Sequence, residues 1–170
     1  VQALHQRGLA HIRQDDLPRA IADLNEAILI DPESPEVFYQ RGLAYAAQKN
    51  YPYAIEDYNQ ALLLSPQNVD IIYQKALAYA NLNQLVEAVE SFNLTLRLNP
   101  AHAAAFYQRG RAYYEQNNYA QAMQDFNQAL SLKPDDQTRA WCLYYRGLTF
   151  SHRGEHQRAI DDFTQALSLE

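Results

Sequence analysis

A period of 34 residues runs through this sequence and constrains its fold more than any other feature. One column of small residues consists of Gly8, Gly42, Ala76, Gly110 and Gly147. A second consists of Ala20, Ala54, Ala88, Ala122 and Ala159. A third column carries Pro32, Pro66, Pro100 and Pro134. Self-similarity at this period predicts an array of like units, in which each buries a face against the next.

The columns place the repeats at 1–34, 35–68, 69–102, 103–136 and 140–170, which we interpret as one array over residues 1–170. The spacing slips by three before the fifth repeat, so Gln137, Thr138 and Arg139 are interpreted as an insertion. The chain starts with Val1 inside the pattern, and we therefore expect it to be a piece of a longer protein.

Each repeat is predicted to form two helices. Apolar residues recur at helical spacing in 35–48 and in 52–64. In each of the first four repeats, a proline follows the second of the two predicted helices. Helical geometry is disfavoured for the residue before a proline, so the helix is expected to end there. Between the two helices lie residues such as Asn83 and Gly154, which accept the left-handed backbone of a tight turn. Glycine and alanine recur where the two helices must approach closely.

These columns resemble the tetratricopeptide repeat family. Residues 39–66, YQRGLAYAAQKNYPYAIEDYNQALLLSP, match the family pattern at nearly every signature position, and the resemblance extends over the whole chain. It implies an all-α fold, an α-solenoid of five helix-turn-helix repeats that forms a right-handed superhelix with a concave groove. It also implies a function in holding another protein or a peptide. An ordinary bundle of similar helices is the alternative.

Two charged columns vary together. Arginine occupies the first column in four repeats and aspartate occupies the second in the same four: Arg7, Arg41, Arg109 and Arg146, with Asp23, Asp57, Asp125 and Asp162. The third repeat has Lys75 and Ser91 instead. Our hypothesis is that each arginine pairs with an aspartate across packed helices; two independent solvated columns are the alternative.

The resemblance places binding on the concave face, which is built from first helices. One groove column carries tyrosines: Tyr39, Tyr73, Tyr107 and Tyr144. A neighbouring column carries glutamines, whose amides can both donate to and accept from a peptide backbone: Gln6, Gln40, Gln74 and Gln108. The remaining candidates for a peptide-binding groove are Leu43, Leu77, Arg111 and Trp141. A structural role for the tyrosines and for Trp141, and simple solvation of the glutamines, are the alternatives.

The glutamines alone can supply only a small binding free energy. Four hydrogen-bonding side chains at roughly 1 kcal/mol each correspond to a dissociation constant of roughly 1 mM. Apolar contacts must supply the remainder of a useful affinity, and Trp141 beside Tyr144 is the natural place for them.

No pattern for catalysis, a cofactor or a metal is present, so we expect no enzyme activity. There is no glycine-rich phosphate loop. His152 and His156 are separated by Gly154 in a predicted turn, which argues against a shared metal site. Cys142, the single cysteine, is interpreted as a packing residue that cannot form an internal disulfide, and we expect a cytoplasmic location.

Charge narrows the partner to a protein or peptide. The net charge of −6 argues against nucleic acid and against an anionic membrane surface. A chaperone C-terminal tail needs a clamp of cations, but the corresponding positions hold His5, Leu9, Gln40, Asp70 and Gln74. The leading hypothesis is an interaction module for an extended segment. A docking domain of a larger enzyme and an element that self-associates into homo-oligomers through uncapped terminal repeats are the alternatives.

Overall fold

Ten helices and no strands make up residues 1–169, the part of the chain that the computed structural model describes. In chain order they are α1 (Gln2–Arg13), α2 (Leu17–Ile30), α3 (Pro35–Ala47), α4 (Tyr51–Leu64), α5 (Val69–Asn81), α6 (Leu85–Leu98), α7 (Ala103–Glu115), α8 (Tyr119–Ser131), α9 (Asp136–His152) and α10 (His156–Leu167). The all-α solenoid fold predicted from the repeat columns is confirmed, with two helices for each predicted repeat.

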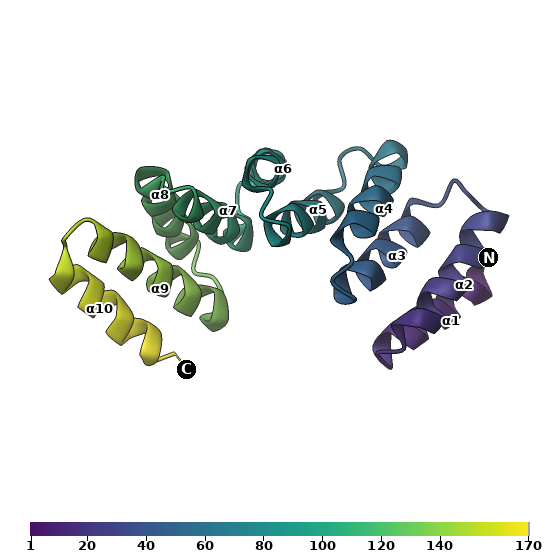
Figure 1. The fold of residues 1–170 in the computed structure, drawn as a ribbon, viewed down its shortest axis with the longest axis horizontal. Coiled ribbons are helices and arrows are strands. Elements are labelled where there is room, and N and C mark those ends of the chain that lie inside the picture. The colour runs from purple at the N-terminus through teal and green to yellow at the C-terminus, as the bar shows by residue number, and fades with distance from the viewer. Residues whose placement is uncertain (170) are drawn as a thin grey trace. The chain divides into compact units, whose positions relative to one another are not determined.

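The chain divides into two compact units, Val1–Gln84 with helices α1 to α5 and a second unit from Leu85 onward with helices α6 to α10. In the first unit, α1 pairs with α2 and α3 pairs with α4, and α5 packs against α4 (Figure 1). In the second unit, α7 pairs with α8 and α9 pairs with α10 (Figure 1). Consecutive hairpins contact each other mainly through one second helix and the following first helix.

The glycine column marks the closest approach within a hairpin. A Cβ atom built on Gly42 would lie 2.6 Å from Cε1 of Tyr58, and one on Gly110 would lie 2.8 Å from Cε1 of Phe126. Both rings are fully buried, so they have no room to withdraw. The sequence-based reason for small residues at these positions is therefore confirmed.

The turn within each hairpin depends on one left-handed residue. The residues with positive φ at these five places are Asp15 (59°), Lys49 (60°), Asn83 (58°), Asn117 (59°) and Gly154 (75°). Asparagine, aspartate and glycine tolerate this conformation at low cost, whereas lysine does not. The turns lie where the sequence predicts them, and each carries one residue in this conformation.

The hypothesis of arginine–aspartate pairing is confirmed in all four repeats that carry both residues. Each arginine on a first helix donates through Nε and Nη2 to both carboxylate oxygens of an aspartate on the following second helix. The Nη2–Oδ1 distances are 2.6 Å for Arg7–Asp23, 2.6 Å for Arg41–Asp57, 2.7 Å for Arg109–Asp125 and 2.7 Å for Arg146–Asp162. The fork of the guanidinium fixes the two helices at one separation.

The same arginines also connect one hairpin to the hairpin before it. Nη1 donates to an asparagine on the preceding second helix: Arg41 to Asn25 (2.7 Å), Arg109 to Asn93 (2.6 Å) and Arg146 to Asn127 (2.8 Å). Arg7 makes no such bond within the described residues, and its side chain is 61% exposed against 19–21% for the other three. One side chain therefore closes a hairpin and joins it to its neighbour.

The residues interpreted as an insertion are helical. Gln137, Thr138 and Arg139 lie in the first turn of α9, which has 17 residues, and Asp135 caps this helix by accepting from the backbone N–H of Thr138 at 2.9 Å. The three extra residues lengthen a helix and do not form a loop. No helix within residues 1–169 combines the length and the apolar character needed to cross a membrane.

Candidate functional site

Each of the four predicted glutamines lies on the first helix of its repeat. Gln40 and Gln74 in the first unit and Gln108 in the second unit are half-buried. Gln40 donates to Oε1 of Glu36 at 2.7 Å, so its amide is engaged within its own helix. Gln6 is exposed, whereas Gln74 and Gln108 are half-buried, and none of these three makes a side-chain hydrogen bond within the described residues. Within the described residues, no other side chain therefore engages the amides of Gln74 and Gln108.

The predicted tyrosines serve different purposes. Tyr107 is only 8% exposed and belongs to the core around Phe126, and burial raises its pKa to about 12. Tyr39 is half-buried and packs against Tyr58 with ring centroids 6.1 Å apart, and Tyr73 is half-buried as well. Tyr144 is 41% exposed. The column is therefore structural at Tyr107 and open to solvent at Tyr144.

The other predicted groove residues are partly engaged. Leu43 packs against the core of the first unit, and Leu77 is half-buried. Arg111 donates through Nε to Oε1 of Glu115 at 3.0 Å. Arg111 therefore already has a carboxylate partner on its own helix.

Six rings in the second unit touch one another in sequence, and we call them the aromatic strip: Trp141, Tyr144, Tyr145, Tyr114, His152 and Tyr119. Successive centroid distances are 5.9, 5.4, 5.7, 5.7 and 4.9 Å. The first four contacts are edge-to-face, the geometry that aromatic quadrupoles prefer, and His152 stacks on Tyr119. The strip crosses α9, the end of α7 and the start of α8.

A hydrogen bond within the aromatic strip holds two of its rings together. The Tyr114 hydroxyl and Nε2 of His152 form a hydrogen bond of 3.0 Å that joins α7 to α9. Burial raises the pKa values of Tyr114 and Tyr145, so both phenols stay protonated at neutral pH. Trp141 is 47% exposed at one end of the strip. The surface thus offers apolar ring faces with hydroxyl and indole N–H groups at their edges.

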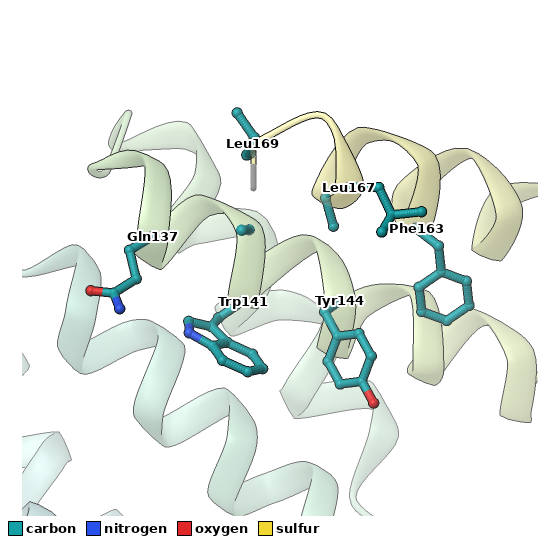
Figure 2. A pocket seen from close by; sticks show the side chains of 8 residues that line it. Gln137, Trp141, Tyr144, Phe163, Leu167 and Leu169 are labelled. Carbon is teal, nitrogen blue, oxygen red and sulfur yellow. The ribbon is translucent and has the colours of Figure 1, made fainter.

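A pocket of about 890 Å³ lies between α9 and α10, and we call it the end pocket. Figure 2 shows Trp141 and Tyr144 on α9 beside Phe163 and Leu167 on α10. Gln137, Ala140, Ala166 and Leu169 complete the lining. Leu167 is 70% exposed, and Trp141 and Tyr144 line this pocket as well as the aromatic strip.

The sequence analysis placed Trp141 and Tyr144 among the candidate groove residues but did not include Tyr114, Tyr119 or His152, which belong to the aromatic strip. These three occupy different repeat columns, so no ladder in the sequence links them. His152 drew attention only as half of a metal pair with His156; it ends α9, whereas His156 begins α10. The signal that could have found the strip is the excess of aromatic residues in 107–152.

The sequence of this chain was compared with models of protein families. A model of the tetratricopeptide repeat matches residues 7–71 and 74–141, which is more than half of the chain. A comparison with curated protein sequences gives no match.

Solved structures with the same fold include other arrays of this kind. MamA 41-end from Desulfovibrio magneticus RS-1 is 22% identical with a TM-score of 0.91, over 99% of this chain and 93% of that chain. A crystal structure of MamA is 21% identical with a TM-score of 0.86, over 95% and 93% of the two chains. YrrB, described as a TPR protein with an unusual peptide-binding site, is 20% identical with a TM-score of 0.81, over 98% and 84%. These likenesses establish a shared fold.

Proposed function

Because this chain belongs to the tetratricopeptide repeat family, whose members are in general non-catalytic protein-interaction modules, we propose that it binds an extended, neutral segment of a partner protein along its first helices. The observation that carries the proposal is the aromatic strip, a run of six touching rings on one unit. The peptide-binding site in the description of YrrB shows that a protein of this fold can bind a peptide.

The chemistry of the strip selects its ligand. The apolar ring faces of the strip suit the apolar side chains of an extended chain. Gln108, on the same unit, can donate to a backbone carbonyl and accept from a backbone N–H. Arg111 is balanced by Glu115, so a strongly acidic segment, including a chaperone C-terminal carboxylate, gains little here.

Aromatic contacts supply the affinity that the glutamines lack. Buried tryptophan and tyrosine anchors each cost about 2 kcal/mol or more when truncated, which is a factor of roughly 30 in the dissociation constant. The 47% exposure of Trp141 means that a ligand still has indole surface to bury. Two such anchors at about 2 kcal/mol each, with one or two glutamine contacts at roughly 1 kcal/mol each, correspond to a dissociation constant of roughly 0.1 mM.

The experiment is a selection of peptides from a displayed library against the wild-type chain, followed by measurement of each dissociation constant. Trp141 is the only tryptophan, so its fluorescence reports occupancy of the strip directly. We expect Trp141→Ala to weaken binding roughly 30-fold and His152→Ala to weaken it several-fold. Variant affinities are measured with a labelled peptide, since Trp141→Ala removes the intrinsic probe.

Tyr53→Ala is the matched control, because Tyr53 is a 55% exposed tyrosine on α4, a second helix outside the strip. It should bind the selected peptides as the wild type does. Peptides that bind all four proteins equally would move the site away from the aromatic strip and refute the proposal.

Homo-oligomerisation through the terminal repeats is a second candidate, favoured by the end pocket with its 70% exposed leucine. Catalysis has no support from Cys142, because burial raises the pKa of its thiol to about 12 and keeps it protonated. A cytoplasmic location is part of the proposal, since a fold with one free cysteine does not depend on a disulfide.

A further inference from the structure

The middle of the aromatic strip lies over an internal junction between hairpins, where α9 packs against both α7 and α8. Tyr145 of α9 meets Tyr114 of α7 edge-to-face at 5.7 Å, and it stacks at 6.1 Å on Phe126 of α8, a fully buried ring. Tyr114 and Tyr145 are each only partly buried. The core therefore fixes one side of these rings, while solvent or a ligand reaches the rest.

The polar groups in one half of the strip are already engaged. The Tyr119 hydroxyl donates to Oδ1 of Asn117 at 2.9 Å. The Tyr114 hydroxyl and Nε2 of His152 bond to each other at 3.0 Å. A segment that lies over these rings meets mainly ring surface. A backbone N–H directed at that surface would lose its water without gaining an acceptor, which is a net cost.

The other half of the strip has hydrogen-bond donors to offer. The Tyr145 hydroxyl, the Trp141 indole N–H and the Gln108 amide make no hydrogen bond within residues 1–169. An indole N–H can only donate, and burial raises the pKa of the Tyr145 phenol, so that it keeps its proton. Glu115, whose charge acts on Tyr145, already pairs with Arg111 at 3.0 Å. The strip thus suits a ligand that is rich in acceptors and poor in donors.

A proline-rich segment has this balance of donors and acceptors. Each proline lacks a backbone N–H and keeps its carbonyl. In the polyproline II conformation no carbonyl is used in an internal hydrogen bond, so all of them can accept from a binding partner. The conformation is formed before binding, which lowers the entropy lost, and aromatic-lined surfaces of several unrelated domains bind such segments.

We propose that the aromatic strip binds a proline-rich segment of a partner protein in the polyproline II conformation. The inference names the ligand of the proposed peptide site and rests on that function. Apolar pyrrolidine rings lie against the faces of Tyr114 and Tyr145. Carbonyls of the segment accept from the Tyr145 hydroxyl and from the Trp141 indole N–H. Segments without proline bind less tightly, because their N–H groups find no acceptor over the rings.

The test compares two labelled decapeptides by fluorescence anisotropy, one of ten prolines and one of alternating serine and alanine. Both carry the same label and blocked ends and have no charged side chain, but the second has an N–H at each residue. We expect the proline peptide to bind the wild-type chain with a dissociation constant of roughly 0.1 mM. The serine–alanine peptide should bind roughly 10-fold more weakly or worse.

Two variants remove one donor each and keep an aromatic ring, Tyr145→Phe and Trp141→Phe. Each should weaken binding of the proline peptide roughly five-fold, which is the loss of one net hydrogen bond. Tyr53→Phe is the matched control, because it makes the same change at a 55% exposed tyrosine outside the strip and should bind as the wild type does. Circular dichroism verifies that all three variants fold.

Equal affinity for the two decapeptides, or full affinity in both strip variants, overturns the assignment of a proline-rich ligand. Library-selected peptides that bind the strip, contain no proline and are not displaced by the proline peptide also overturn it, while the proposed function stands. Selected peptides that are rich in proline and are displaced by it support the assignment. If neither the library nor the proline peptide yields binding at the strip, both the assignment and the proposed function fall.

Discussion

The four arginine–aspartate pairs have the same geometry but different exposure, and their contribution to stability should follow exposure. Arg109 and Asp125 are 19% and 6% exposed, whereas Arg7 is 61% exposed with Asp23 at 9%. The Nη2–Oδ1 distances differ by 0.1 Å (2.7 and 2.6 Å). Solvent screens the Arg7 pair more strongly than the Arg109 pair, and Arg109 also donates to Asn93, whereas Arg7 makes no such bond within the described residues.

The perturbation is a double-mutant cycle with Arg109→Met and Asp125→Ala. Two charge-assisted hydrogen bonds in a shielded setting are worth roughly 1.5 kcal/mol each, which gives a coupling energy of about 3 kcal/mol. Asp125→Ala alone should cost more than the double variant, because it leaves a shielded guanidinium without its carboxylate. The third repeat, with Lys75 and Ser91, already lacks both partners and shows that a hairpin position tolerates their joint loss.

The assay is urea unfolding followed by circular dichroism and by the fluorescence of Trp141, with the same cycle made at Arg7 and Asp23. We expect a clearly smaller coupling energy for the exposed pair. Equal couplings at the two sites, or a coupling below about 0.5 kcal/mol at Arg109–Asp125, would refute the argument from exposure.

Two further predictions concern packing and titration. Gly42→Ala should lower the free energy of unfolding by roughly 1–3 kcal/mol, because its Cβ would lie 2.6 Å from the Tyr58 ring, and adding Tyr58→Leu should recover part of that loss in urea unfolding. Tyr107 has a pKa of about 12 in the fold against about 10 in an unfolded chain, so its stabilisation is complete below pH 10 and is lost as pH rises through 12. Tyr107→Phe should therefore flatten the fall of the urea midpoint between pH 10 and 12, and an unchanged slope would contradict this account.

Much of the fold follows from single columns of the repeat. Gly42 must be small because a ring lies against it, and a left-handed residue must stand at Asn83 or Gly154 for the chain to reverse. The joint absence of arginine and aspartate from the third repeat was enough to predict the pairing in the others. The shift of three residues before the fifth repeat indicated an insertion, but spacing alone does not say which structure it adopts, and the structure places it in the first turn of α9.

The sequence by itself determined the number and kind of helices, their turns and the pairs that join them, because these depend on neighbours at fixed separations within or between repeats. Tertiary structure alone decided which side chains form the aromatic strip. Tyr107 and Tyr144 share a column, yet one is buried in the core and the other is exposed beside Trp141. Tyr114, His152 and Tyr119 share no column and still touch. Ring contacts depend on side-chain rotamers and on what the next hairpin covers, and neither is encoded in the period of the repeat.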